Sequence, residues 1–201
     1  STQLLTPAMA GVLDGIRRAK GRPFHAMSPQ EARIAYVERS GVLELPRAAL
    51  ARDEDVELPG ARGASLRARV YSPRAKGESA AQGTLLYFHG GGFVIGGIAT
   101  HDSLCSRLAL LGDCAVISLE YRLAPEHPFP TAVDDCWAVL SHLAAGGAAA
   151  LGLDGGRLAV GGDSAGGTLA AVCALMARDA GLPLALQVLI TPGTAARTDS
   201  P

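Results

Sequence analysis

The fold is organised around one glycine-rich stretch, Val160-Gly161-Gly162-Asp163-Ser164-Ala165-Gly166-Gly167. A strand is expected before it, over residues 157–160, and a helix after it, over residues 168–178. The spacing G-x-S-x-G is that of a nucleophile elbow, in which small residues on both sides of the serine prevent collisions in a tight strand-to-helix turn. Ser164 would then lie at a helix N-terminus, which favours developing negative charge. The alternative is a glycine-rich turn in which Ser164 is only an N-cap.

A second glycine motif, His89-Gly90-Gly91-Gly92-Phe93, follows a short apolar run at residues 84–88. The run predicts a strand that is buried on both faces. Three successive glycines suit neither a helix nor a strand interior, but they let backbone N–H groups approach a ligand closely. An HGGG loop of this kind supplies oxyanion-hole donors in lipases and esterases, whereas the alternative is a flexible loop without chemistry. His89 itself is interpreted as holding the loop by hydrogen bonding.

Composition narrows the class of protein. The chain has 201 residues, 48% of them hydrophobic, and a formal net charge of −1. These values indicate one sizeable globular domain and argue against disorder and against a nucleic-acid partner. No apolar run reaches the roughly 20 residues of a membrane span. Four cysteines without a C-x-x-C pair indicate free thiols and a cytoplasmic location, and neither a metal nor another cofactor is expected.

The first 50 residues are expected to form a helical segment distinct from the rest. Ser28-Pro29-Gln30-Glu31 is a strong helix start, with Ser28 as N-cap and Glu31 at the third position, and Gly41 would end this helix. Three residues of the helix are expected to face inward: Ala32, Tyr36 and Val37.

Residues 51–201 are expected to form an α/β core with a mostly parallel, doubly wound sheet, because short apolar runs alternate with helical patterns. The expected strands are 55–58, 65–71, 84–88, 115–119, 157–160 and 184–190, and the expected helices are 101–111, 131–144 and 168–178. Three prolines make residues 121–130 a rigid, extended connection. Asp134 and Asp135 are interpreted as acids favoured by the dipole in the first turns of the helix that follows.

Three motifs together resemble the hormone-sensitive-lipase-like group of α/β-hydrolases, which are carboxylesterases and lipases. The motifs are His89 to Phe93, the segment Tyr121-Arg122-Leu123-Ala124-Pro125-Glu126-His127-Pro128-Phe129-Pro130, and Gly162 to Gly167. The resemblance implies that residues 1–50 help to cap the active site and that the substrate is a small ester. It implies that Ser164 is the nucleophile that becomes acylated, and that the backbone N–H groups of Gly91, Gly92 and Ala165 form the oxyanion hole. Residues 121–130 match a structural segment.

The resemblance also shows what these 201 residues lack. In this fold the catalytic residues follow the order serine, acid, histidine. After Ser164 the only acids are Asp179 and Asp199, neither in a suitable place, and there is no histidine. The triad acid and histidine are therefore not expected in this chain, which would be truncated after the strand that follows the nucleophile helix.

Three accounts follow: the N-terminal part of an esterase whose C-terminal part is separate, an inactive truncated chain, or a non-enzymatic binding protein like the plant gibberellin receptors, which lack the family's catalytic histidine. The first two are favoured, because the glycine loop and Ser164 are intact. Amidase or peptidase chemistry stays open. The chain alone would be feebly active at best, and His89 is the first substitute base to test. An open edge at strand 184–190 would pair with a second copy or with the missing segment.

Overall fold

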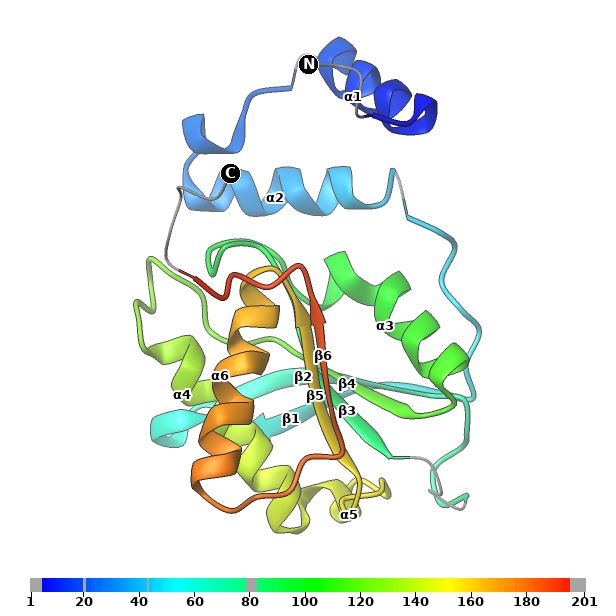
Figure 1. Cartoon of the computed structure of the whole chain (residues 1–201), viewed down its shortest axis with the longest axis vertical. Coiled ribbons are helices and arrows are strands. Elements are labelled where there is room, and N and C mark those ends of the chain that lie inside the picture. The colour runs from blue at the N-terminus through cyan, green and yellow to red at the C-terminus, as the bar shows by residue number, and fades with distance from the viewer. Residues whose placement is uncertain (1–4, 20, 43, 79–82, 196–201) are drawn as a thin grey trace.

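The computed structural model describes residues 5–19, 21–42, 44–78 and 83–195 (Figure 1). Asp199, which was considered above as a possible acid, lies outside these described residues. Six strands form one sheet: β1 Arg52–Pro59, β2 Ser65–Ser72, β3 Thr84–Phe88, β4 Ala115–Leu119, β5 Leu158–Asp163 and β6 Leu186–Ile190. Their order in the sheet is β1-β2-β4-β3-β5-β6. The pairs β3–β4, β3–β5 and β5–β6 are parallel, and β1–β2 and β2–β4 are antiparallel.

Helices cover both faces of this sheet, as the sequence predicts (Figure 1). They are α1 Pro7–Ala19, α2 Pro29–Ser40, α3 Ile98–Gly112, α4 Thr131–His142, α5 Ala148–Ala150 and α6 Ala165–Asp179. Short turns of other helix types complete the list: η2 Phe24–Ala26, η3 Ala61–Gly63 and η4 Leu143–Gly147. Figure 1 shows α3 on one side of the sheet and α4 with α6 on the other.

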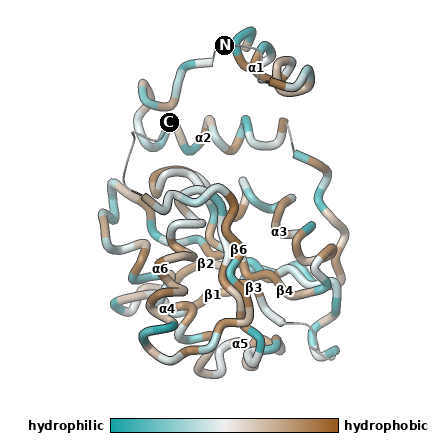
Figure 2. The backbone as a smooth tube through the Cα atoms, viewed as in Figure 1, coloured by the Kyte–Doolittle hydropathy of each residue, from teal (hydrophilic) through white to brown (hydrophobic). Residues whose placement is uncertain are grey.

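The core has two halves because successive side chains of a strand point to opposite faces. On β3, Leu86 and Phe88 pack in the cluster that includes α4 and α6, whereas Leu85 and Tyr87 pack in the cluster that includes α3. Figure 2 shows the hydrophobic residues gathered along the central strands. All five residues of β3 are buried, so the prediction of a strand covered on both faces is confirmed.

The N-terminal segment forms two helices, and α2 lies across the end of the sheet where α6 begins, with α1 beyond it (Figure 1). Ser28 accepts a hydrogen bond from the Glu31 N–H at 3.2 Å, and the Glu31 carboxylate accepts one from the Ser28 N–H at 2.7 Å. This capping box and the end of α2 before Gly41 are confirmed. Of the three residues expected to face inward, Ala32 is buried and Tyr36 is half-buried, whereas Val37 is 53% exposed, so the expectation is wrong for Val37.

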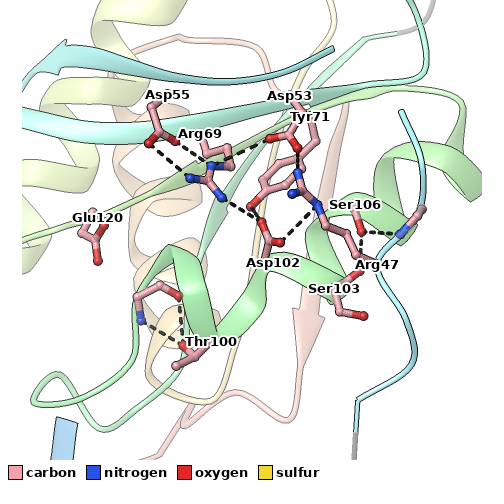
Figure 3. Close-up of polar contacts among 12 residues, drawn as sticks. Arg47, Asp53, Asp55, Arg69, Tyr71, Thr100, Asp102, Ser103, Ser106 and Glu120 are labelled. Carbon is pink, nitrogen blue, oxygen red and sulfur yellow. Dashed lines mark hydrogen bonds and ion pairs between the residues drawn. The ribbon is translucent and has the colours of Figure 1, made fainter. Parts of the chain in front are cut away.

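The segment between α2 and the sheet is not helical, although the first 50 residues were expected to be so. Residues 44–51 run without a helix or strand alongside α3. The Ala48 N–H donates to the Ser106 hydroxyl at 3.0 Å, and the Ser103 hydroxyl donates to the Leu45 carbonyl at 2.6 Å. Figure 3 shows this segment also tied through Arg47 to Asp102. Side chains of α3 therefore fix the path from α2 into the sheet.

None of the helices among the described residues combines the length and the apolar character that crossing a membrane requires.

Candidate active site

The turn between β5 and α6 holds Ser164 in a strained conformation. Its backbone has φ 50° and ψ −117°, in a region that residues other than glycine rarely adopt, while its side chain is exposed. A Cβ atom on Gly166 would overlap the carbonyl of Phe88, and one on Gly162 would overlap the backbone of Gly166. The tight turn therefore requires glycine at both positions, which is the physical reason given for the elbow spacing.

The sheet brings the glycine loop to this turn. β3 and β5 are parallel neighbours, with Phe88 opposite Gly162, so the two segments that follow them leave the same edge of the sheet. Three successive residues of the loop have positive φ: 123° at Gly91, 60° at Gly92 and 65° at Phe93. The glycine loop and the Ser164 turn therefore lie at the same end of the sheet, where one ligand could contact both.

The amide groups expected to form an oxyanion hole have no hydrogen-bond acceptor within the described part of the chain. The N–H groups of Gly91, Gly92 and Ala165 donate to no other residue there. Buried or half-buried N–H groups normally find a protein acceptor or water. N–H groups without an acceptor in the described part of the chain, at the same end of the sheet as an exposed serine, are available to bind a carbonyl oxygen.

Asp163 fixes the glycine loop to the elbow, a role that sequence reasoning missed. Its Oδ1 accepts hydrogen bonds from the Tyr87 hydroxyl at 2.9 Å and from the Gly90 N–H at 3.0 Å, and lies 3.1 Å from His101 Nε2. Burial pulls the pKa of Asp163 upward, but the hydrogen bonds from His101, Tyr87 and Gly90 outweigh it and lower the pKa below its usual value. An acid directly before the elbow serine was the available signal, but its direction could not be read from the sequence.

His89 supports the loop from beneath and is a poor candidate for a base. Its Nδ1 lies 2.8 Å from the Gly90 carbonyl, which can only accept, so Nδ1 carries the proton. The ring stacks on Tyr121 at 4.3 Å, and the Tyr121 hydroxyl donates to the His89 carbonyl at 2.7 Å. Burial lowers the pKa of His89 to about 4. The interpretation as a loop-holding residue fits this geometry, whereas a fully buried ring does not suit proton transfer at an exposed serine.

Two further ionisable residues, His101 and Asp179, have structural partners. His101 is buried and faces Asp163 and the Thr100 hydroxyl. Asp179 is exposed at the end of α6 and pairs with Arg178 at 2.7 Å. Among the described residues, no group of three or more His, Cys, Asp or Glu side chains could hold a metal ion.

Asp134 and Asp135 differ in burial and in their partners, although the sequence predicts the same role for both. Asp134 lies 3.6 Å from exposed Arg62, whereas Asp135 is fully buried and accepts hydrogen bonds from the Arg122 guanidinium at 2.6 and 2.8 Å. The helix dipole alone therefore does not explain the position of Asp135, because this residue also forms a buried ion pair. Its pairing with Arg122 agrees with a structural role for residues 121–130.

A mixed sheet with parallel central strands, a strained serine between β5 and α6 and a glycine loop after β3 define the α/β-hydrolase fold. A family model described as alpha/beta hydrolase fold matches residues 85–201, and the chain belongs to this family. The expected fold and the expected likeness to esterases are confirmed.

Two of the relatives with similar sequences are named as an esterase and as an ethyl acetate hydrolase. The chain is 44% identical over 160 residues to Esterase LipI of Mycobacterium tuberculosis, covering 78% of this chain and 49% of the relative. It is 38% identical over 207 residues to Ethyl acetate hydrolase of Pseudomonas putida, covering 98% of this chain and 64% of the relative. The chain thus spans about half to under two thirds of the length of these proteins.

Solved structures agree. The ester-hydrolase EH1AB1 from the Lake Arreo metagenome has a TM-score of 0.88 and 40% identity, with 98% of this chain and 63% of that one covered. An esterase of the archaeon Pyrobaculum calidifontis has a TM-score of 0.85 and 40% identity, with 98% and 61% covered.

Proposed function

We propose that the complete protein is a serine carboxylesterase that hydrolyses short- to medium-chain acyl esters. The observation that carries the proposal is the exposed, strained Ser164 at the same sheet edge as a glycine loop with unpaired amide donors. The relatives named esterase and ethyl acetate hydrolase support an ester as the substrate class. No cofactor and no nucleic acid has a part in this proposal.

The chemistry proceeds through an acyl-enzyme. The Ser164 Oγ attacks the ester carbonyl carbon, and the negative charge that develops on the carbonyl oxygen is stabilised by the N–H groups of Gly91, Gly92 and Ala165. Collapse of the tetrahedral intermediate breaks the ester C–O bond and releases the alcohol, leaving the acyl group on Ser164. Water then attacks the acyl carbonyl carbon, the bond from this carbon to Ser164 Oγ breaks, the carboxylic acid leaves, and a proton from the water returns to Ser164 Oγ. Each of the three donors contributes about 3 kcal/mol of transition-state stabilisation.

A base must take the Ser164 proton and pass it to the departing alcohol. In α/β-hydrolases this base is a histidine, oriented by an acid, and both follow the serine in the sequence. All five histidines of the chain precede Ser164. In the proposal, the histidine and the acid therefore come from polypeptide beyond residues 1–201. The 201 residues alone are then feebly active at best.

The exposed edge of β6 is where the further segment, or a second copy of the chain, pairs. The four cysteines are free, which supports a cytoplasmic location as part of the proposal.

The test is turnover of 4-nitrophenyl acetate and 4-nitrophenyl butyrate by the full-length gene product. Ser164→Ala should lower kcat by about 10⁴-fold or more, because it removes the nucleophile. Ser65→Ala is the matched control, since it removes a hydroxyl from the β1–β2 hairpin, where Ser65 contacts Glu57. Unchanged turnover in Ser164→Ala would refute the proposal. A purified 201-residue chain, verified by intact mass, should show only residual turnover, and ordinary esterase rates from it would require a substitute base.

A further inference from the structure

Arg33 of α2 forms hydrogen bonds to two segments beside the candidate active site: the glycine loop after β3 and the proline-rich segment 121–130. Its Nε donates to the Val94 carbonyl at 2.8 Å, and its Nη2 donates to the Ala124 carbonyl at 2.9 Å. The Glu126 carboxylate accepts from both terminal nitrogens, at 2.6 and 2.9 Å, and also from Gln30 at 3.0 Å. The Arg33 side chain is 28% exposed. A planar guanidinium held by a bidentate carboxylate has a fixed direction, so its remaining donors are aimed at the two carbonyls.

Those two carbonyls belong to the backbone that shapes the glycine loop. The Val94 N–H donates to the Gly91 carbonyl at 3.1 Å, and the Ala124 N–H donates to the Phe93 carbonyl at 2.9 Å. Gly91, Gly92 and Phe93 all have positive φ, and for Phe93 this conformation is unfavourable. Such backbone persists only where surrounding contacts determine it. The hydrogen bonds through Val94 and Ala124 are contacts of that kind, and Arg33 binds both residues.

We infer that Arg33 is a positioning residue: it holds the Gly91–Phe93 backbone so that the amide donors face the ester oxygen. This inference rests on the proposed function and adds to it. Helix α2 then has a role beyond covering the site, because its removal would break the hydrogen bonds that hold the backbone of the glycine loop. Glu126 acts through Arg33 by fixing the direction of the guanidinium. The Arg33 hydrogen bonds lower the pKa of Glu126 to about 2, so the pair stays charged across the neutral range.

The variant that tests the inference is Arg33→Met, which keeps an unbranched side chain and removes every donor. Arg33→Lys retains the charge and can reach one of the carbonyls, so its effect should be intermediate. The matched control is Arg22→Ala. Arg22 lies in the same N-terminal segment, pairs with Glu31 at 3.0 Å and donates to the Ala26 carbonyl. Within the described residues it has no hydrogen bond or ion pair to the glycine loop.

The first measurement is amide hydrogen exchange in the 201-residue chain, which needs no catalysis. The N–H groups of Val94 and Ile95 both donate to the Gly91 carbonyl and report whether the turn is closed. Arg33→Met should speed their exchange by about tenfold, whereas Arg22→Ala should leave it unchanged. Unchanged exchange at both amides in Arg33→Met would overturn the inference.

The second measurement is the division between kcat and KM in the full-length product. Arg33→Met should lower kcat by about 10- to 100-fold with KM changed by less than about threefold, because misplaced donors weaken the transition state more than the bound ester. A rise in KM with kcat unchanged would mean that Arg33 only anchors a cover, and would also overturn the inference. If Arg33→Met does not fold, Arg33→Lys and Glu126→Gln are measured in the same way, and wild-type values for both would count against it.

The two proposals fail differently. Full turnover in Ser164→Ala sinks the esterase proposal but leaves the exchange result standing as a measure of the coupling between Arg33 and the loop. Loss of turnover in Ser164→Ala together with wild-type exchange and wild-type kcat in Arg33→Met keeps the esterase and removes the positioning role.

Discussion

At the scale of single residues, the Asp163 side chain connects three parts of the fold beside the candidate active site. Its carboxylate gathers the Tyr87 hydroxyl, the Gly90 N–H and the His101 ring, which come from β3, the glycine loop and α3. Hydrogen bonds to an ionised group are each worth about 1.5–3 kcal/mol. The carboxylate therefore fixes the start of the glycine loop to the residue before Ser164.

Asp163→Asn should lower the free energy of unfolding by about 2 kcal/mol at pH 7, since the amide keeps the shape but loses the charge and one acceptor oxygen. The pKa of Asp163 is lower in the folded protein than its ordinary value of 3.8. Its contribution is therefore fully present above pH 3.8 and is lost as the pH falls toward the folded pKa.

Urea unfolding of wild type and Asp163→Asn between pH 7 and pH 3 measures this difference. The gap between the two proteins should narrow toward pH 3, whereas Asp179→Asn, at an exposed site with side-chain exposure of 68%, should follow wild type throughout. A gap that is the same at both ends of the pH range would show that the Asp163 charge has no part in stability.

Some residues of the candidate site could be predicted from the sequence, and others could not. The elbow and the glycine loop were predictable because local backbone geometry demands glycine at fixed spacings. The roles of Asp163 and Arg33 were not, because they depend on where side chains point after the chain has folded. Arg33 and Glu126 are 93 positions apart, and nothing local in the sequence connects them.

At the scale of elements, α4 is joined to its surroundings by the buried Asp135. Besides the Arg122 guanidinium, its carboxylate accepts from the Ala61 N–H at 3.2 Å and from the Arg122 N–H at 3.2 Å. One carboxylate thus connects α4, the turn η3 and the proline-rich connection. The sequence predicted the helix and the rigid connection but could not reveal this contact between them.

Asp135→Asn should destabilise the protein by about 3 kcal/mol, because it leaves the Arg122 charge without its partner in a partly buried place. Asp134→Asn is a matched control on the same turn of α4, and its exposed contact with Arg62 is worth at most about 1 kcal/mol. The helix dipole affects the two positions similarly, so the difference isolates the buried pair. Urea midpoints supply the comparison, and equal midpoints for the two variants would contradict this assignment.

At the scale of the whole molecule, the two ends of the sheet are unlike. At one end the antiparallel hairpin of β1 and β2 carries charged residues, including Asp55 and Arg69, whose side chains pair at 2.6 Å. At the other end β6 pairs on one side only within the described residues, and Leu186 is 59% exposed. A hollow of about 290 Å³ lies there, lined by residues of α6, of the segment before β6 and of β6 itself. Charges protect the first edge, whereas the second edge is apolar.

The 201-residue chain should therefore associate through β6 as its concentration rises, since an apolar edge strand is a template for pairing. Leu186→Lys places a charge on that edge and should shift the molecule toward the monomer in sedimentation-velocity experiments. Leu111→Lys is the control, because Leu111 is 82% exposed on α3 and lies on another surface. In the full-length product neither variant should change the mass if a further segment covers β6. A wild-type chain that remains monomeric at every concentration would exclude pairing between copies at this edge.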